Sequence, residues 1–407
     1  MNSLELLKRA GLVHDFTEGL DLDSGPMTFY CGFDPTAESL HVGHLSVIRM
    51  IQGLQSMGHR PIVLIGNGTA PIGDPSGRLS GRDELKSDFS DNIQKQILSL
   101  LPEGVSVRRN KEWFNNIGML EFLEEFGKFF RLSDMLSKES VKQRMNSDEG
   151  MSLNEFLYQS LQAMDFMLLS KFMDCKLQIG GSDQWGNILS GVTLVRKMTG
   201  AKVHGLTFPL LTDSRGQKFG KSSSNKQIWL NPDLTSPFDF FQFWFNLSDL
   251  DAIKLIDVFL DLSVSERKDL DLVTDQHPAK RTIQKRLAFE MTKWVHGEGL
   301  AEISRFISTS LTSERITKDQ LSFAEENFDS LPNLTLKEDE NPLMSTVLAD
   351  SGLARSRSDA KRKIKEGCVF SNKARLAGDI HSETFMMSNP CIIQLGKKHL
   401  IILKKET

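Results

Sequence analysis

The sequence has 407 residues, of which 39% are hydrophobic and 25% charged, with a formal net charge of −4. These proportions are those of ordinary globular proteins, so they argue against a disordered chain or a membrane protein. At about 100 to 200 residues per domain, the length predicts two or three domains. No apolar run approaches the roughly 18 residues that cross a bilayer, and acidic residues near the N-terminus argue against a transit peptide. We therefore expect a cytoplasmic protein.

The cysteines and the charge distribution narrow the class further. Cys31, Cys175, Cys368 and Cys391 lie far apart without a C-x-x-C pair, which argues against a zinc site or a disulfide framework and favours reduced thiols. Residues 343–407 hold 12 Lys and Arg against 6 Asp and Glu, whereas the remainder holds 37 against 47. This basic tail on an acidic body indicates contact with a polyanion.

Strand and helix patterns alternate through the first half of the chain. Residues 28–34 (TFYCGFD) are predicted as a strand, residues 41–58 as an amphipathic helix and residues 60–68 (RPIVLIGNG) as a second strand. A unit of this kind is a βαβ crossover, which builds a buried parallel sheet. Residues 176–187 (KLQIGGSDQWGN) repeat the pattern, and residues 205–225 combine a short strand with a polar Gly/Ser loop.

The second half is predicted to be mainly helical. Residues 237–263 and 281–308 have apolar residues at helical spacing and charged residues on the opposite face. An acidic, Pro-containing stretch then precedes the basic tail and has the composition of a linker. We therefore predict an α/β protein of four parts: a Rossmann-like parallel-sheet catalytic domain (1–220), an α-helical domain (221–325), a linker (326–342) and a small α+β module (343–407).

The first candidate for chemistry is FDPTAESLHVGH, which joins the first strand to the first helix. Ligands bind at the carboxyl ends of parallel strands, where helix N-termini present N–H groups to phosphate. His41 and His44 share one face of the first helical turn, and Gly43 between them has no side chain to block a nucleotide. The pattern suits a triphosphate, although a metal site or two surface histidines would also fit this motif taken alone.

The second candidate is the loop KFGKSSSN. Lys218 and Lys221 are placed on a Gly- and Ser-rich segment from which they can reach phosphate oxygens. A lysine pair of this kind is also common on solvated surfaces. The spacings GxxxxGK[ST] and GxGxxG are not met, which argues against a P-loop or a dinucleotide fold.

The third candidate is the apolar helix NEFLYQSLQAMDFMLLS. It is interrupted at Tyr158, Gln162 and Asp165, whose spacings of four and three place them on one stripe. Buried polar groups need partners. A structural polar network would supply them, but three polar groups aligned with the other motifs favour a ligand pocket.

Together these stretches resemble the signature motifs of class I aminoacyl-tRNA synthetases. HVGH is similar to their HIGH motif, and KFGKS is similar to their KMSKS motif with Phe219 and Gly220 in place of Met and the first Ser. YCGFDPT, GDPSG, YQSLQAMD and GSDQWGN follow in the order typical of one family in this class, the tyrosyl-tRNA synthetases. The resemblance covers nearly the whole chain, including the basic tail.

The resemblance implies an enzyme that activates tyrosine with ATP and transfers the tyrosyl group to the terminal ribose of tRNA(Tyr). In such a site Tyr30 and Asp165 hydrogen-bond the substrate phenol, while Asp74, Tyr158 and Gln162 hold its ammonium group. Asp165 can accept from the phenolic O–H, and Asp74 can pair with the cation. Phenylalanine would leave these buried polar groups unpaired, so the pocket would reject it.

For ATP, the resemblance places Cys31 and Asp183 at the ribose, and Thr36, His41 and His44 near the phosphates and the ribose. Gln184 helps to orient the reacting carboxylate. Four basic residues match those that bind the departing pyrophosphate: Arg78, Arg82, Lys218 and Lys221. Arg78 stands where Lys is common in the family. The tyrosine carboxylate then attacks the α-phosphorus in line, without a covalent enzyme intermediate.

The resemblance also implies cofactors and partners. ATP is a substrate accompanied by Mg²⁺, with neither a permanently bound cofactor nor a dedicated metal site. The family forms homodimers, and the apolar stretch 112–136 is a candidate for the interface or for an internal core helix. The tail resembles a small RNA-binding module, whose usual Gly-Gly is Gly367-Cys368 here. Four cations of its helix are expected to contact RNA: Arg357, Lys361, Arg362 and Lys365.

Two other functions compete with this one. Tryptophanyl-tRNA synthetases share the fold and closely related signatures, but Tyr30 with Asp165 and the appended module favour tyrosine. A nucleotide-binding, RNA-associated protein without synthetase activity would not need Gln184 or both lysines. The sequence therefore favours tyrosine activation.

Overall fold

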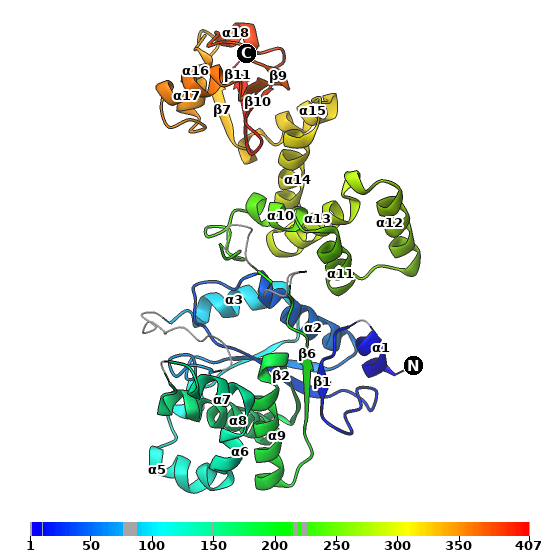
Figure 1. Ribbon diagram of the computed structural model, residues 1–407, viewed down its shortest axis with the longest axis vertical. Coiled ribbons are helices and arrows are strands. Elements are labelled where there is room, and N and C mark those ends of the chain that lie inside the picture. Colours follow the sequence, from blue (N-terminus) through cyan, green and yellow to red (C-terminus); the bar gives the residue numbers. More distant parts are fainter. Residues whose placement is uncertain are drawn as a thin grey trace. The chain divides into compact units, whose positions relative to one another are not determined.

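The computed structural model describes residues 2–9, 11–75, 88–148, 150–212, 214, 219–220 and 226–406. The chain divides into two compact units, Met1–Thr235 with Leu247–Ile283 and Ser236–Asn246 with Gln284–Thr407. Each unit contains one β-sheet (Figure 1). These bounds differ from those of the four predicted parts, whose boundaries stay predictions. No helix in the described ranges is both long and apolar enough to cross a membrane.

The first unit is built on a sheet with the strand order β1-β6-β5-β2-β3-β4. Neighbouring strands are parallel, except that the two-residue β1 runs antiparallel to β6. The prediction of an α/β fold with a parallel, Rossmann-like sheet is therefore confirmed. The bounds of the strands are β1 (Asp15–Phe16), β2 (Thr28–Phe33), β3 (Arg60–Ile65), β4 (Ser106–Arg109), β5 (Cys175–Gly181) and β6 (His204–Phe208).

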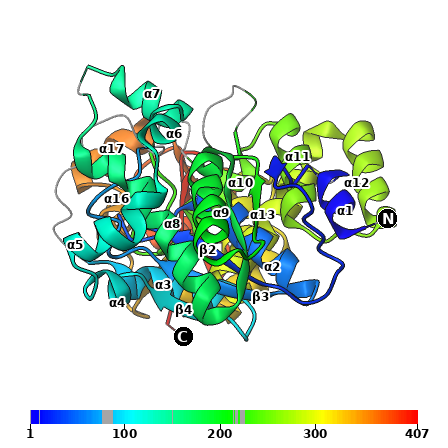
Figure 2. The same cartoon turned by 90° about the horizontal axis from the view of Figure 1, so that it is seen from below.

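Helices cover both faces of this sheet. Helices α8 and α9 lie side by side on one face, and α2 and α3 lie on the other (Figures 1 and 2). The helices of this unit are α1 (Ser3–Arg9), η1 (Val42–His44), α2 (Leu45–Ser56), α3 (Ser90–Leu100), α4 (Lys111–Phe114), α5 (Met119–Glu121), η2 (Phe122–Phe126), η3 (Gly127–Phe129), α6 (Leu132–Leu136), α7 (Glu139–Met145), α8 (Leu153–Met173), η4 (Ser182–Gln184), α9 (Trp185–Thr199), α11 (Asp249–Phe259), α12 (Val264–Gln276) and η5 (Pro278–Lys280).

Helix α8 has clear start and stop signals, and its position sets the site. Ser152 accepts a hydrogen bond from the Glu155 amide while the Glu155 carboxylate accepts from the Ser152 amide, so a capping box begins the helix. Asp174 ends it in the left-handed region, with φ of 49°. Along one side, Phe166 packs in the same core as Tyr30 of β2. The polar stripe of α8 is thereby held against the middle of the sheet.

The second unit combines helices with a sheet of strand order β7-β11-β10-β8-β9. Only the β7–β11 pair is parallel among the paired strands of this sheet in the described residues. Its elements are α10 (Pro237–Phe245), α13 (Thr282–His296), α14 (Glu298–Thr312), α15 (Lys318–Glu326), η6 (Phe328–Ser330), β7 (Asn333–Leu336), α16 (Met344–Asp350), α17 (Arg357–Lys365), β8 (Val369–Ser371), β9 (Ala374–Arg375), α18 (Ser382–Phe385), β10 (Cys391–Leu395) and β11 (His399–Lys405).

Both faces of this second sheet are buried. Ile392, Leu400 and Ile402 share a core with residues of α14 and α15. Ile393 and Ile401, which point to the opposite face, share a core with residues of α16 and α17. A strand buried on both faces is a continuous apolar run, and the sequences CIIQL and HLIIL are runs of this kind.

The stretch 326–342, which we predicted as a linker, contains η6 and β7. Strand β7 pairs in parallel with β11. Leu331 belongs to the core that α14 and α15 form, and Leu336 belongs to the core on the other face. Strand β7 has only four residues and lies in an acidic stretch, so composition alone indicated a linker. In the structure this stretch supplies the edge strand of the second sheet.

Candidate active site

Most of the described candidate residues from the three motifs lie at or near one edge of the first sheet. Asp34 directly follows β2, Asp74 lies in the loop after β3, and η4 with Asp183 and Gln184 directly follows β5. Because these three strands are parallel neighbours, their carboxyl ends meet. In open α/β sheets this is where ligands bind.

The histidine turn has a defined hydrogen-bond pattern. The His41 amide donates to Nδ1 of His44 at 3.1 Å, and the Gly43 amide donates to Nδ1 of His41 at 3.1 Å. The two rings lie 4.0 Å apart between centroids. Because each Nδ1 accepts, the neutral rings carry their proton on Nε2. Burial lowers the pKa of His44 to about 4, so this ring is a neutral hydrogen-bond donor near pH 7.

The histidine turn also contacts the described part of the lysine motif. A Cβ atom added at Gly43 would lie 3.3 Å from the carbonyl oxygen of Phe219. A Cβ atom added at Gly220 would lie 3.3 Å from Cγ2 of Val42 and 3.5 Å from the Gly43 nitrogen. The two motifs, about 175 residues apart in the sequence, therefore meet through two glycines. The close approach and the φ of +123° at Gly220 explain why glycine replaces the family's serine there.

Tyr30 and Asp165 lie in the buried part of the site. The Tyr30 side chain is 1% exposed, and its hydroxyl has no hydrogen-bond partner within the described ranges. Burial, with the nearby charge of Asp165, raises the pKa of Tyr30 well above its usual value. An unpaired buried hydroxyl is costly, by about 1 to 3 kcal/mol. A ligand hydroxyl between these two side chains would remove that cost.

Asp165 is held by two donors that the sequence analysis missed. Nδ2 of Asn110 donates to Oδ2 at 3.1 Å, and Nε1 of Trp113 donates to Oδ1 at 2.8 Å. Burial raises the pKa of Asp165 to about 8, and it outweighs both hydrogen bonds, which act in the opposite direction. Near pH 7 this carboxyl therefore holds a proton, and above about pH 8 it is an acceptor only.

A chain of hydrogen bonds links Asp165 to the edge of the sheet. Asn110 also donates to Oγ1 of Thr69 at 3.0 Å, and Thr69 donates to Asp34 at 3.0 Å. The hydroxyl of Tyr158 donates to the other oxygen of Asp34 at 2.8 Å. Tyr158 is thus oriented by Asp34. Asp34 lies in the stretch FDPTAESLHVGH, but the sequence pattern did not indicate this role.

A second chain centres on Gln184. Its Nε2 donates to Oδ2 of Asp74 at 2.6 Å, and its Oε1 accepts from Gln162 at 3.2 Å and from Asn187 at 3.3 Å. Oε1 of Gln162 is buried without a hydrogen-bond partner among the described residues. The structure therefore joins Asp74, Gln162 and Gln184, which the resemblance placed at the ammonium and carboxylate groups of one amino acid.

The remaining residues predicted from the sequence are Cys31, Thr36, Asp183 and four basic residues. Cys31 is buried in β2, and burial raises the pKa of its thiol to about 12, so it is a neutral group. Thr36 is exposed, and its amide donates to the Asp34 carbonyl at 2.8 Å. Asp183 lies in η4 beside Gln184. Four predicted residues lie outside the described residues: Arg78, Arg82, Lys218 and Lys221.

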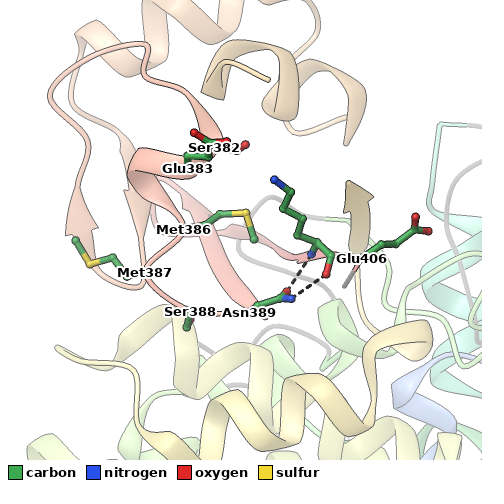
Figure 3. Close-up of a pocket in the computed structure, with 8 residues that line it drawn as sticks. Ser382, Glu383, Met386, Met387, Ser388, Asn389 and Glu406 are labelled. Atoms are coloured by element: carbon green, nitrogen blue, oxygen red, sulfur yellow. Dashed lines mark hydrogen bonds between the residues drawn. The ribbon is translucent and has the colours of Figure 1, made fainter. Parts of the chain in front are cut away.

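Neither a metal cluster nor the hollow in the second unit competes with this site. In the described ranges no group of three or more His, Cys, Asp or Glu side chains is arranged to hold a metal ion. The hollow has a volume of about 340 Å³, and Glu383, Met386 and Asn389 are among its lining residues (Figure 3). The Asn389 amide bonds both backbone groups of Lys405. None of the sequence-predicted residues lines this hollow.

The predicted RNA-binding residues are exposed on α17, but they differ in their partners. Arg362 is paired with Asp359 and Glu366, each at 2.7 Å, and Lys361 lies 3.9 Å from Asp379. Arg357 and Lys365 form no ion pair within the described part of the chain. Their charges are therefore the more available ones for a polyanion.

Comparison with known proteins decides the family. The family model described as tRNA synthetases class I (W and Y) matches residues 22–307. The tyrosine–tRNA ligase of Desulfitobacterium hafniense (strain DSM 10664 / DCB-2) is 40% identical over 422 residues, which span 99% of this chain and 100% of that protein. The chain belongs to the tyrosine–tRNA ligase family. The tyrosine–tRNA ligase of Oceanobacillus iheyensis is 38% identical over 430 residues and 100% of both chains.

A solved structure agrees with this membership of the tyrosine–tRNA ligase family. The C-terminally truncated mitochondrial tyrosyl-tRNA synthetase of Aspergillus nidulans superposes with a TM-score of 0.67 at 30% identity. It covers 75% of this chain and 92% of its own. The resemblance inferred from the sequence motifs is therefore confirmed, and the tyrosine–tRNA ligase relatives favour tyrosine over the tryptophan alternative.

Proposed function

We propose that the protein is a tyrosine–tRNA ligase, which joins tyrosine to ATP to give tyrosyl-adenylate and pyrophosphate and then esterifies the terminal ribose of tRNA(Tyr). The observation that carries this proposal is the buried Tyr30 hydroxyl beside Asp165, in a chain of this family. That buried pair forms a site that can recognise a hydroxyl group.

Tyrosine recognition uses both chains of hydrogen bonds. The substrate phenol lies between Tyr30 and Asp165, where it satisfies the Tyr30 hydroxyl. Its ammonium group lies at Asp74, Gln162 and Tyr158, whose oxygens can accept hydrogen bonds from a cation. Tyrosine enters with its own phenol protonated, because its ordinary pKa is about 10. Phenylalanine would leave the buried pair unsatisfied and is rejected.

The activation step relies on position and charge. Gln184 is already hydrogen-bonded to Asp74 and Gln162, so it can orient the carboxylate of tyrosine toward the α-phosphorus. Nδ1 of both His41 and His44 accepts a backbone hydrogen bond, so each ring can donate from Nε2 to phosphate oxygens on which negative charge develops. ATP enters as its Mg²⁺ complex. Arg78, Arg82, Lys218 and Lys221 keep their proposed role at the departing pyrophosphate.

Nucleotide and tRNA contacts complete the proposal. Cys31 and Asp183 are proposed at the ribose of ATP, and Thr36 and Gly43 near its phosphates. The cations of α17 contact the tRNA backbone, with Arg357 and Lys365 contributing more than the paired Arg362. The cytoplasmic location stays a prediction from the sequence.

We further propose that the enzyme is a homodimer, with an interface in the stretch 112–136. Five large apolar side chains of this stretch are between 41% and 73% exposed in the single chain: Met119, Leu120, Leu123, Leu132 and Leu136. Apolar patches of this kind mark protein–protein contacts. Sedimentation of the wild type and of a Leu120→Asp variant tests this: a variant that remains dimeric would exclude this surface, and a monomeric wild type would exclude the dimer.

Amino-acid-dependent exchange between ATP and pyrophosphate, without tRNA, tests the activity itself. We expect exchange with tyrosine and none with phenylalanine or tryptophan. Exchange with tryptophan would overturn the specificity. Absence of exchange with all three, together with retained tRNA binding, would favour the RNA-associated protein that lacks synthetase activity.

A further inference from the structure

Residues 227–231 follow the lysine motif (218–225) after Lys226, and they lie along the histidine turn. The Val42 amide donates to the Ile228 carbonyl at 3.1 Å, and the Leu230 amide donates to the Leu40 carbonyl at 2.8 Å. Trp229 meets the ring of His41 edge-on, with 6.2 Å between centroids. The backbone that leaves the lysine motif is therefore tied to the backbone that carries the two histidines.

Gln227 adds a side-chain hydrogen bond to the lysine motif. Its Nε2 donates to the Gly220 carbonyl at 3.1 Å, and the Ile228 amide donates to the same oxygen at 3.1 Å. Gly220 in turn rests on Val42 and Gly43, so that no side chain fits between them without displacement. The carbonyl of Gly220 is thus held by a side chain whose own backbone is anchored next to the histidine turn.

We propose that Gln227 is a positioning residue for the activation step. Its amide holds the carbonyl of Gly220, and thereby keeps Gly220 packed against Val42 and Gly43 of the histidine turn. Groups that stabilise charge in a transition state act only when they are held in place beforehand. This inference rests on the proposed function, in which the histidine turn and the lysine motif both stabilise charge on the phosphates of ATP during activation.

The variant Gln227→Met removes the donor while keeping the side-chain length. We expect kcat for tyrosine-dependent exchange to fall by about 3- to 10-fold, the range that corresponds to one net neutral hydrogen bond. KM for tyrosine should stay within about 2-fold, because Gln227 has no hydrogen bond to the residues proposed to bind tyrosine in the described part of the chain. Transfer of the tyrosyl group from isolated enzyme-bound adenylate to tRNA should keep its rate, since pyrophosphate has already left.

A matched control is available in α2. Nε2 of Gln55 donates to the Glu103 carbonyl at 2.7 Å, which is the same kind of bond at a place without a role in the site. Gln55→Met should leave both steps unchanged. Gln227→Glu keeps the shape but turns an ionised acceptor toward the carbonyl, so its loss of kcat should be at least as large as that of Gln227→Met.

The outcomes separate the possibilities. Exchange by Gln227→Met or Gln227→Glu within about 2-fold of the wild type would overturn the positioning role. Equal losses in exchange and in transfer, or an equal loss in Gln55→Met, would mean that Gln227 acts only through general stability. Thermal melting of each variant excludes misfolding as the cause. Absence of exchange in the wild type would instead overturn the proposed function itself.

Discussion

The pKa of about 8 at Asp165 makes a prediction about stability. In the unfolded chain this carboxyl has its ordinary pKa of 3.8, whereas in the folded protein burial keeps the proton bound up to about pH 8. Between these values folding takes up a proton, so the free energy of unfolding falls as the pH rises. The loss is about 1.4 kcal/mol per pH unit and is complete above about pH 8.

The variant Asp165→Asn cannot lose a proton and escapes this penalty. At about pH 5.5 it should be less stable than the wild type, because its single amide oxygen meets two donors, Asn110 and Trp113. From about pH 5.5 to about pH 7.5 the free energy of unfolding of the wild type falls by about 2.7 kcal/mol because of this group. That of the variant does not, so the stability of the variant relative to the wild type should rise by the same amount. Urea unfolding followed by tryptophan fluorescence at each pH measures it.

A difference between Asp165→Asn and the wild type that does not change with pH would refute the reasoning. It would mean that the two donors keep Asp165 ionised in the folded protein. The variant Trp113→Phe sharpens the test, because loss of a donor should raise the pKa of Asp165 and extend the fall in stability to higher pH.

Three further predictions concern other parts of the molecule. Gly43→Ala places a methyl group 2.8 Å from the ring of the preceding histidine and should lower the exchange kcat by about tenfold or more, whereas a wild-type rate would contradict the close packing of the two motifs. Arg144→Met leaves Glu155, its partner at 3.1 Å, without a cation and should reduce the free energy of unfolding by about 2 kcal/mol in urea; a loss below about 0.5 kcal/mol would show that water replaces the pair. Arg357→Ala should raise KM for tRNA about threefold, more than Arg362→Ala, whose guanidinium is already paired, and equal effects in aminoacylation assays would contradict this ranking.

The sequence predicted the elements that carry a strong local pattern. The strand around Tyr30, the histidine turn and the polar stripe of α8 were all found where their periodicity placed them. The stripe was informative because Tyr158, Gln162 and Asp165 interrupt an otherwise apolar helix. Such a pattern has few explanations other than a pocket or a polar network. In the structure all three side chains belong to hydrogen-bond networks, whereas the ligand pocket stays a prediction.

The partners of Asp165 could not be found in the same way. Asn110 directly follows β4 and Trp113 lies in α4, more than 50 residues from Asp165. Only the order of strands in the sheet brings them to α8. A polar residue at the carboxyl end of a strand was the available signal, but β4 is short and half-buried, so its pattern was too weak to mark it.

Two long helical patterns in the second half also divided unexpectedly. Residues 237–263 form α10 and α11, and residues 281–308 form α13 and most of α14. Ser248 caps α11 by accepting from the Asp251 amide, and Gly297 has a φ of 89° between α13 and α14. Both breaks follow ordinary capping chemistry, which the continuous apolar pattern across them had concealed.

Because the second sheet is buried on both faces, deleting its strands would also expose the helices that pack against it. Removal of residues 343–407 would take away Ile392, Leu400 and Ile402 and leave Phe306 and Ile307 of α14 facing water. A shortened enzyme would therefore expose an apolar surface that is buried in the complete protein. A fall in its tRNA affinity could then come either from lost RNA contacts or from aggregation. Substitutions of the charged residues on α17 would test RNA binding separately from packing, because they leave the apolar interior of the sheet intact.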